Sequence, residues 1–346
     1  MSQLLVSYWY PHQLKQQTTA WRDAMLGAAV FGREPAMTEI FGVHVSAVHS
    51  PVVGQADGLL EIWRSTQPVT SGQRGAIYYR HDQQLLFGSL EVAEHDYAVP
   101  HTVSGGTPLQ AATESAFQQI FALIDSLRFP HLLRVWNYFA DINQESLSLE
   151  RYRQFNVGRQ AGFVAAGRSL EHNLPSACAL GVSGGPLVIY FIAGRNEPVA
   201  VENPRQVSAF HYPAAYGPKS PSFSRASLVR VGEQEMLFVS GTSSIVGHRS
   251  VHVGDVVAQT NETLVNIEAV VQEANRLARR AQFDCAKLCF KVYLRRPEDR
   301  DVVHATLVRA LGADIQAFYL QADVCRHDLL VEIEATGGIP AQSGHP

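Results

Sequence analysis

Residues 236–245 read Met-Leu-Phe-Val-Ser-Gly-Thr-Ser-Ser-Ile, and residues 85–92 read Leu-Leu-Phe-Gly-Ser-Leu-Glu-Val. Both stretches are short apolar runs, which are typical of buried β-strands. Phe87 and Phe238 occupy the same place in the two runs, roughly 150 positions apart, a spacing that indicates duplicated domains rather than a solenoid. The two stretches therefore predict an internal duplication of the chain.

The same series of elements follows each of these strands. Residues 107–127 and 255–277 carry apolar side chains along one helical face, so both predict amphipathic helices. The later elements are predicted as strands at 131–143 and 286–299, helices at 150–167 and 300–312, and pairs of strands at 176–194 and 317–335. Each copy then reads β-β-α-β-α-β-β, which predicts an α+β fold of mixed sheets with helices packed on one face.

The duplication also suggests domain boundaries. We predict an N-terminal half at 1–195 that includes extra strands before the first copy, and a C-terminal half at 235–346. The connection at 196–234 is rich in Pro, Ser and Tyr. Because a loop of this length in a compact chain is often functional, we expect the connection to contribute to a binding site.

Composition narrows the class of partner. The net charge is −4 and hydrophobic residues make up 46% of the chain, which argues against nucleic acid or an anionic membrane as the main partner. The N-terminus has no basic start followed by an apolar core, and no apolar run approaches the length of a membrane span, so we expect a cytoplasmic protein. Cys285 and Cys289 lack the second pair that a zinc site needs, so we expect neither a metal nor an organic cofactor.

One predicted strand, at 329–335, carries a candidate catalytic residue, whereas the motif at 181–185 does not. Residues 181–185 match G-x-S-x-G, but a strand follows instead of the helix that a nucleophile elbow needs, so a β-hairpin turn is the better interpretation. Residues 329–335 read Leu-Leu-Val-Glu-Ile-Glu-Ala, and aligning Val331 with Val188 places Glu332 opposite Ile189. A carboxylate on an apolar strand is unfavourable unless it is solvated or has a task. Glu332 is therefore either a general acid whose pKa burial raises, or a residue on an outer, solvated sheet face.

The connection offers candidate ligands for an anion. Arginine and lysine beside tyrosine suit a small ring-bearing carboxylate, and a solvated loop is the alternative. The candidates are Arg205, Tyr212, Tyr216, Lys219 and Arg225, with Arg159 added from the helix at 150–167.

The sequence resembles two known protein groups, and these resemblances indicate which reaction the patterns serve. The C-terminal copy resembles the YjgF-like (chorismate-mutase-like) reactive-intermediate deaminase superfamily in VSGTSSI and LLVEIEA, where the resemblance implies that Glu332 is catalytic. The arginine that binds the substrate carboxylate in that superfamily has no counterpart in the matching stretch 317–328. The whole chain is similar to the chorismatase family in RVWNYFADIN (134–143), ERYRQFNVGR (150–159), the run 203–226 and SGTSSIVGH (240–248).

The chorismatase resemblance implies one site per chain, between the two halves, with chorismate as substrate. Glu332 would protonate the enol ether, while Arg159 and the Tyr and Arg residues of 203–226 would hold the two carboxylates. Gly241 and Ser243 of the SGTxS turn would also contact the substrate. A cysteine at the position of Cys325 accompanies hydroxybenzoate formation in the family. The resemblance therefore implies pyruvate and 3-hydroxybenzoate as products, with 4-hydroxybenzoate as a second aromatic product and a role in supplying pigment or quinone precursors.

Three alternatives remain open at this point. The first is hydrolysis of chorismate to pyruvate and a dihydroxycyclohexadiene carboxylate. The second is an imine or enamine deaminase on the same fold, and the third is a binding module without catalysis. A duplicated chain supplies part of the superfamily's trimer interface internally, so the expected state is a monomer or a small homo-oligomer.

Overall fold

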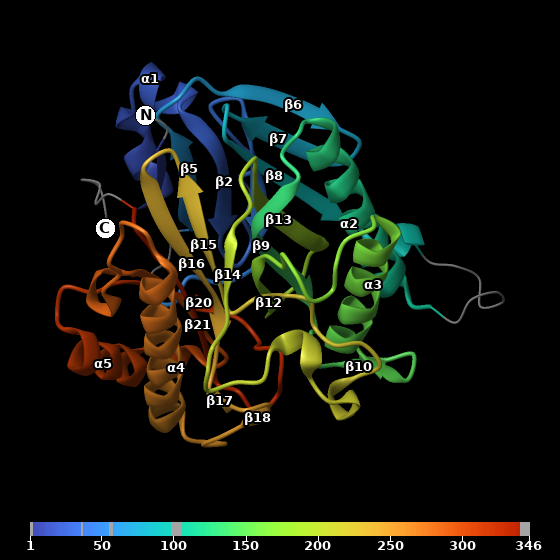
Figure 1. Cartoon of the computed structure of the whole chain (residues 1–346), viewed down its shortest axis with the longest axis vertical. Coiled ribbons are helices and arrows are strands. Elements are labelled where there is room, and N and C mark those ends of the chain that lie inside the picture. Colours follow the sequence, from blue (N-terminus) through green and yellow to red (C-terminus); the bar gives the residue numbers. More distant parts are fainter. Residues whose placement is uncertain (1–2, 36, 55–57, 98–105, 340–346) are drawn as a thin grey trace.

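The computed structural model describes residues 3–35, 37–54, 58–97 and 106–339 (Figure 1). These residues form three large sheets and two short two-stranded ribbons. The first sheet has the strand order β1 (Leu4–Trp9), β5 (Leu59–Ser65), β2 (Met25–Phe31), β4 (Val43–Val48) and β3 (Glu39–Ile40). These strands are among the extra strands expected before the first copy, and a short helix, α1 (Thr19–Asp23), lies between β1 and β2 in the sequence.

The second sheet contains six strands from the N-terminal copy. Their order is β12 (Ser176–Val182), β9 (His131–Ala140), β13 (Leu187–Gly194), β8 (Leu85–Val92), β7 (Ile77–His81) and β6 (Thr70–Arg74). Two helices belong to this sheet, α2 (Pro108–Ser126) and α3 (Arg151–Ala165).

The third sheet repeats this arrangement with the C-terminal copy, and two of its strands come from the two ends of 196–234, the stretch expected as a loop. Its order is β20 (Gln316–Gln321), β19 (Cys289–Leu294), β21 (Val331–Gly337), β16 (Gln234–Thr242), β15 (Ala226–Val231) and β14 (Val199–Val201), with helices α4 (Val256–Leu277) and α5 (Arg300–Leu311). Each strand has a counterpart in the same place of the second sheet, and in both sheets the two outermost strands at one end pair in parallel. The predicted α+β fold with two repeats is therefore confirmed.

The helices cover one face of each six-stranded sheet because their apolar sides match it. Phe117, Ile120 and Ile124 of α2 are buried in one core with β8, β9 and β13, and Ile267 and Val270 of α4 are buried in another with β16, β19 and β21. Thr107 and Asp255 accept hydrogen bonds from the first turns of α2 and α4, and caps of this kind each stabilise a helix by about 1 kcal/mol. Figure 1 shows α2 and α3 on the side of the molecule away from α4 and α5.

The helix-free faces of the three sheets meet in a shared core. Trp63 of β5, Trp136 of β9 and Phe238 of β16 are each at most 1% exposed and belong to one cluster. The two repeats also join at their edges, where the backbones of Gly181 and Asp323 exchange two hydrogen bonds of 2.8 Å. The inner face of β21 is consequently buried against the N-terminal repeat.

Strand pairing corrects the alignment of the two final strands. Val188 pairs with Tyr138 in the second sheet, and Glu332 pairs with Tyr293 at the same place in the third. Glu332 therefore corresponds to Val188, one residue away from the Ile189 that the sequence alignment gave. Because side chains alternate across a strand, this one-residue difference moves the glutamate from the helix-covered face to the inner face.

Two further expectations are wrong. Residues 183–186 do not form a hairpin turn, because β12 and β13 lie on opposite sides of β9 and do not pair with each other. The interpretation of Glu332 as a residue on a solvated outer face also fails, because Glu332 is only 4% exposed.

Candidate active site

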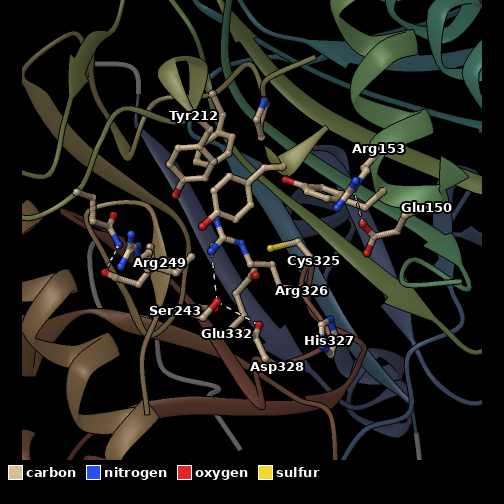
Figure 2. Close-up of a pocket in the computed structure, with 18 of the residues that line it drawn as sticks. Glu150, Arg153, Tyr212, Ser243, Arg249, Cys325, Arg326, His327, Asp328 and Glu332 are labelled. Atoms are coloured by element: carbon tan, nitrogen blue, oxygen red, sulfur yellow. Dashed lines mark hydrogen bonds and ion pairs between the residues drawn. The ribbon is translucent and has the colours of Figure 1, made fainter. Parts of the chain in front are cut away.

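A cavity of about 400 Å³ lies where the two repeats and their connection meet (Figure 2). Its walls come from the start of α3, the connection around residues 206–225, the turn after β16 and the loop before β21. The predicted site residues that line it are Tyr212, Tyr216, Arg225, Gly241, Ser243, Cys325 and Glu332. Side chains from both halves of the chain thus face one partly open cavity, which is large enough for a small ring compound.

Glu332 combines burial with access to this cavity. Its side chain is 4% exposed, and no hydrogen bond or ion pair joins it to another described residue. Burial, with a smaller contribution from the nearby Glu334 carboxylate, raises the pKa of Glu332 to about 8, although Arg134 opposes the shift. A carboxyl group with such a pKa keeps its proton at neutral pH, as a general acid requires.

Gly241 explains how the carboxyl group fits beside β16. A methyl group built on Gly241 would overlap the carboxylate of Glu332, so any larger residue at this position displaces the acid. Gly241 therefore leaves room for the carboxyl group of Glu332, and its predicted contact with substrate stays a prediction. Ser243 in the same turn donates a hydrogen bond of 3.0 Å to the carbonyl of Val331, so its hydroxyl group fixes the backbone directly before the acid.

Glu334, two residues further along β21, has a different environment. Trp136 Nε1 donates to it at 3.0 Å, Lys291 Nζ lies 2.7 Å away, and Arg134 forms a second ion pair. Burial alone would raise the pKa of Glu334, but Lys291 and Arg134 lower it below its usual value. The two glutamates on one face therefore differ in charge, Glu332 being neutral and Glu334 ionised.

The connection places cationic and aromatic side chains together on the opposite wall. Arg225 is 6% exposed and donates from Nη2 to Tyr212 Oη at 2.9 Å and to the carbonyl of Val207 at 2.8 Å. The Tyr212 and Tyr216 rings lie 5.5 Å apart, and Tyr216 Oη is 3.1 Å from His248 Nδ1. This wall offers phenol groups and a guanidinium group to an anionic ring compound.

Arg326 is a cavity residue that the sequence analysis missed. Its guanidinium group lies 4.2 Å from the centre of the Tyr216 ring, and Nη1 donates to the carbonyl of His248 at 2.9 Å. Its Nη2 is buried with no hydrogen-bond partner among the described residues. The only available signal was its position directly after Cys325, and nothing in the local pattern distinguished it from a solvated arginine.

Three predicted binding residues do not line the cavity. Arg205 pairs with Glu262 at 2.7 Å and holds the connection against α4, while Lys219 is exposed. Arg159 is 3% exposed on α3, where burial lowers its pKa to about 10, and its Nη2 donates a hydrogen bond of 2.9 Å to Asn156 Oδ1. It interacts with Tyr152, which does line the cavity, so Arg159 lies behind that wall.

Cys325 lines the cavity with a neutral thiol. Burial, followed by the neighbouring Glu332, raises the pKa of Cys325 to about 12. The group is thus not a thiolate nucleophile at neutral pH. Figure 2 shows Cys325 and Arg326 projecting toward the same space as Tyr212 and Glu332.

With one buried acid and a cationic, aromatic wall, the cavity has the chemistry that suits a small anionic molecule. A model of the FkbO/Hyg5-like chorismatase N-terminal region matches residues 61–193. The 3-hydroxybenzoate synthase of Streptomyces hygroscopicus is 36% identical over 292 residues, which cover 82% of each chain, and a chorismatase of Streptomyces rapamycinicus is 36% identical over 296 residues, which cover 84% of this chain and 85% of the relative. A crystal structure of a chorismatase superposes with a TM-score of 0.84 at 31% identity, covering 97% of this chain and 98% of the other.

The chain therefore belongs to the chorismatase family, and it is an enzyme that converts chorismate. The resemblance noted in its sequence motifs is confirmed by relatives that match along most of its length. No helix among the described residues is long and apolar enough to cross a membrane. Within the same residues, no group of three or more His, Cys, Asp or Glu side chains is arranged to hold a metal ion.

Proposed function

We propose that this enzyme cleaves chorismate to pyruvate and 3-hydroxybenzoate, with 4-hydroxybenzoate as a second aromatic product, and that Glu332 is the proton donor. One observation carries the proposal: Glu332 is a buried, unpaired carboxyl group that borders the cavity. Its pKa of about 8 keeps it protonated at neutral pH. The name of the 3-hydroxybenzoate synthase relative supports the choice of product.

The first chemical step uses that proton. Chorismate carries an enol ether, and transfer of the Glu332 proton to its terminal methylene carbon forms a methyl group and an oxocarbenium-like centre. A general acid held within hydrogen-bond reach contributes about 10²–10⁴ to the rate of such a step. The ion pairs of Glu334 with Arg134 and Lys291 keep Glu334 ionised, so Glu334 does not itself take up the proton.

Two outcomes then diverge. Capture of one water molecule at the side chain releases pyruvate and leaves a dihydroxycyclohexadiene carboxylate. Elimination with aromatisation releases pyruvate and a hydroxybenzoate, which together contain all the atoms of chorismate, so no water is consumed. We assign this substrate to the second branch because Cys325 projects into the cavity beside Glu332, where its neutral thiol is available to steer the ring or to assist a proton or hydroxyl shift.

The two carboxylates of chorismate require cationic partners. Arg225 and Arg326 line the cavity, and each has a guanidinium nitrogen that is buried without a partner in the described residues. Charge-assisted hydrogen bonds from arginine to carboxylate are short and directional, so these groups would fix the substrate in one pose. Tyr212 and Tyr216 would contact the ring, and Arg159 would add positive potential from behind Tyr152.

The test is incubation of the purified enzyme with chorismate, with pyruvate followed enzymatically and the ring products separated by chromatography. Pyruvate with 3-hydroxybenzoate, and with a smaller amount of 4-hydroxybenzoate, is the expected result. Pyruvate with the diene acid would retain the family and refute the assignment of the aromatising branch. Turnover of an amino-acid-derived enamine with release of ammonia, and none of chorismate, would refute the proposal in favour of a deaminase.

A further inference from the structure

Four charged side chains form a continuous buried cluster where the three sheets meet. Glu334 binds both Arg134 and Lys291, and Lys291 Nζ also lies 3.0 Å from Oε2 of Glu61. Glu61 comes from β5, Arg134 from β9, and Lys291 and Glu334 from the adjacent β19 and β21. No side chain of the cluster is more than 7% exposed. Each sheet therefore contributes charge to one site in the core.

Hydrogen bonds satisfy the two carboxylates of this cluster. Tyr8 donates to Glu61 at 3.0 Å, and Tyr190 donates to the same carboxylate at 2.8 Å. Trp136 completes the shell of Glu334. Removing charges from water is unfavourable, and buried ion pairs stabilise a fold little more than apolar side chains of the same size. Stability alone therefore does not account for four charges in this core.

Burial is the main cause that raises the pKa of Glu332, and the balance of charge in the cluster adds to it. Two cations and two anions cancel, so the cluster offers Glu332 no unpaired positive charge. Arg134, which is near enough to favour an ionised Glu332, is already paired with Glu334. An ionised Glu332 would be a third buried anion beside two cations, which is unfavourable in a medium of low polarity.

The acidic and basic side chains that line the cavity with Glu332 belong to Glu150, Arg153, Arg225, Arg249, Arg326, His327 and Asp328, and the variants below leave all of them unchanged. Four further groups around Glu332 are neutral and leave the balance of charge in the cluster unchanged. They are Tyr293 opposite it on β19, Cys178 on β12, Tyr152 on α3 and Cys325 before β21. Burial is the main cause that raises the pKa of each above its usual value, so none carries charge near neutral pH. Of the charged groups, Glu334 and Arg134 have the largest electrostatic effect on Glu332.

We propose that the Glu61–Lys291–Glu334–Arg134 cluster serves the reaction by keeping the acid Glu332 protonated. It does so because its four charges neutralise one another in ion pairs. The inference rests on the proposed role of Glu332. Glu61 and Lys291 act through Glu334 and are positioning residues, because neither lines the cavity. The proposal makes the pH range of the enzyme depend on the net charge of a cluster that does not touch substrate.

The experiment compares pH profiles of kcat/KM for pyruvate release by the wild type and the E61Q variant. This parameter reports the pKa values of the free enzyme. E61Q removes one anion and leaves a net positive charge, which favours ionised Glu332. In E61Q, kcat/KM is expected to decline at a pH about one unit lower than in the wild type. At alkaline pH this shift is about a tenfold loss of kcat/KM, while kcat/KM at the acid end of the profile is retained.

A second variant separates charge from packing. E61Q/K291M removes a pair of opposite charges and restores a neutral cluster, so its high-pH decline is expected to return to the wild-type position although it has lost more contacts. Y8F is the matched control, because it removes a hydrogen bond from the Glu61 carboxylate without changing any charge. Its high-pH decline is expected to stay at the wild-type position.

The outcomes are distinct. In the first outcome, the wild type releases pyruvate from chorismate and E61Q shows the same high-pH decline of kcat/KM as the wild type. This result overturns the role of the cluster and leaves the proposed function intact. The role of the cluster is also overturned if the high-pH decline shifts as far in E61Q/K291M as in E61Q, or if it shifts in Y8F. Either result would mean that the shift comes from altered packing and not from charge. If E61Q does not fold, as judged by circular dichroism, a shift in E61Q/K291M overturns the proposal, and a wild-type profile supports it. Absence of pyruvate from the wild type removes the proposed function, and the inference with it.

Discussion

Replacement of Glu332 by Gln should change how the stability of this protein depends on pH. The pKa of Glu332 is about 8 in the folded protein, against 4.5 for an ordinary glutamate. The folded state therefore holds this proton to a higher pH than the unfolded chain does. Wherever the folded state binds more protons, stability falls as pH rises. Between about pH 4.5 and pH 8, Glu332 thus makes the wild type progressively less stable.

The magnitude follows from the size of the shift. One pKa unit corresponds to 1.36 kcal/mol, so the wild type should lose about 3 kcal/mol between about pH 5 and pH 7.5 from this group alone. Glutamine has the same shape and no charge, and it has no proton to lose in either state. The free energy of unfolding of E332Q, relative to the wild type, should therefore rise by about 3 kcal/mol over this range.

The assay is urea unfolding of both proteins at about pH 5 and pH 7.5, followed by tryptophan fluorescence and circular dichroism. Coincident curves from the two probes are needed before a free energy is assigned, because a chain with several sheets does not always unfold in one step. A difference between variant and wild type that is the same at both pH values would refute the reasoning. It would mean that Glu332 is ionised in the folded protein, or that it is solvated.

Three further substitutions and one pH profile of the wild type test the site. C325A should move the products from hydroxybenzoates toward the diene acid while pyruvate release continues, and an unchanged ratio by chromatography would show that Cys325 does not act on the branch. R326M should raise KM for chorismate by about tenfold to a hundredfold through loss of a charge-assisted hydrogen bond, with a smaller effect on kcat; an unchanged KM would show that Arg326 does not bind the substrate. G241A should lower kcat by at least about tenfold because its methyl group displaces the Glu332 carboxyl, and wild-type kcat would contradict that packing. In the wild type, kcat/KM should decline above about pH 8 as Glu332 ionises, and a flat profile up to pH 10 would contradict the assigned pKa.

The repeat and its elements follow from local patterns, so the sequence predicts them well. The amphipathic helices at 107–127 and 255–277 need only a 3.6-residue period, and the structure gives α2 and α4 within one residue of those bounds. The register of the final strand was off by one, because Val188 and Val331 look alike in a run of Val and Ile. Only the pairing with Tyr138 and Tyr293 determines the face.

The environment of Glu332 was beyond prediction from local patterns. Partners that distinguish Glu334 from Glu332 come from distant parts of the chain: Arg134 lies 200 positions from Glu334, and Trp136 lies 198 positions from it. Arg326 was missed for the same reason, since its value as a ligand comes from the Tyr216 ring and the His248 carbonyl across the cavity. The predicted domain boundaries at 195 and 235, and the binding roles of Arg159, Arg205 and Lys219, stay predictions.

The most direct test of the central claim compares pyruvate release from chorismate by wild-type enzyme and E332Q, with each protein shown to be folded. The wild type should release pyruvate together with a hydroxybenzoate. The kcat of E332Q should be about 10²–10⁴-fold lower, since the variant keeps the shape of the site and lacks the proton. Wild-type activity in E332Q would contradict the account, because the carboxyl group would then not be the proton donor.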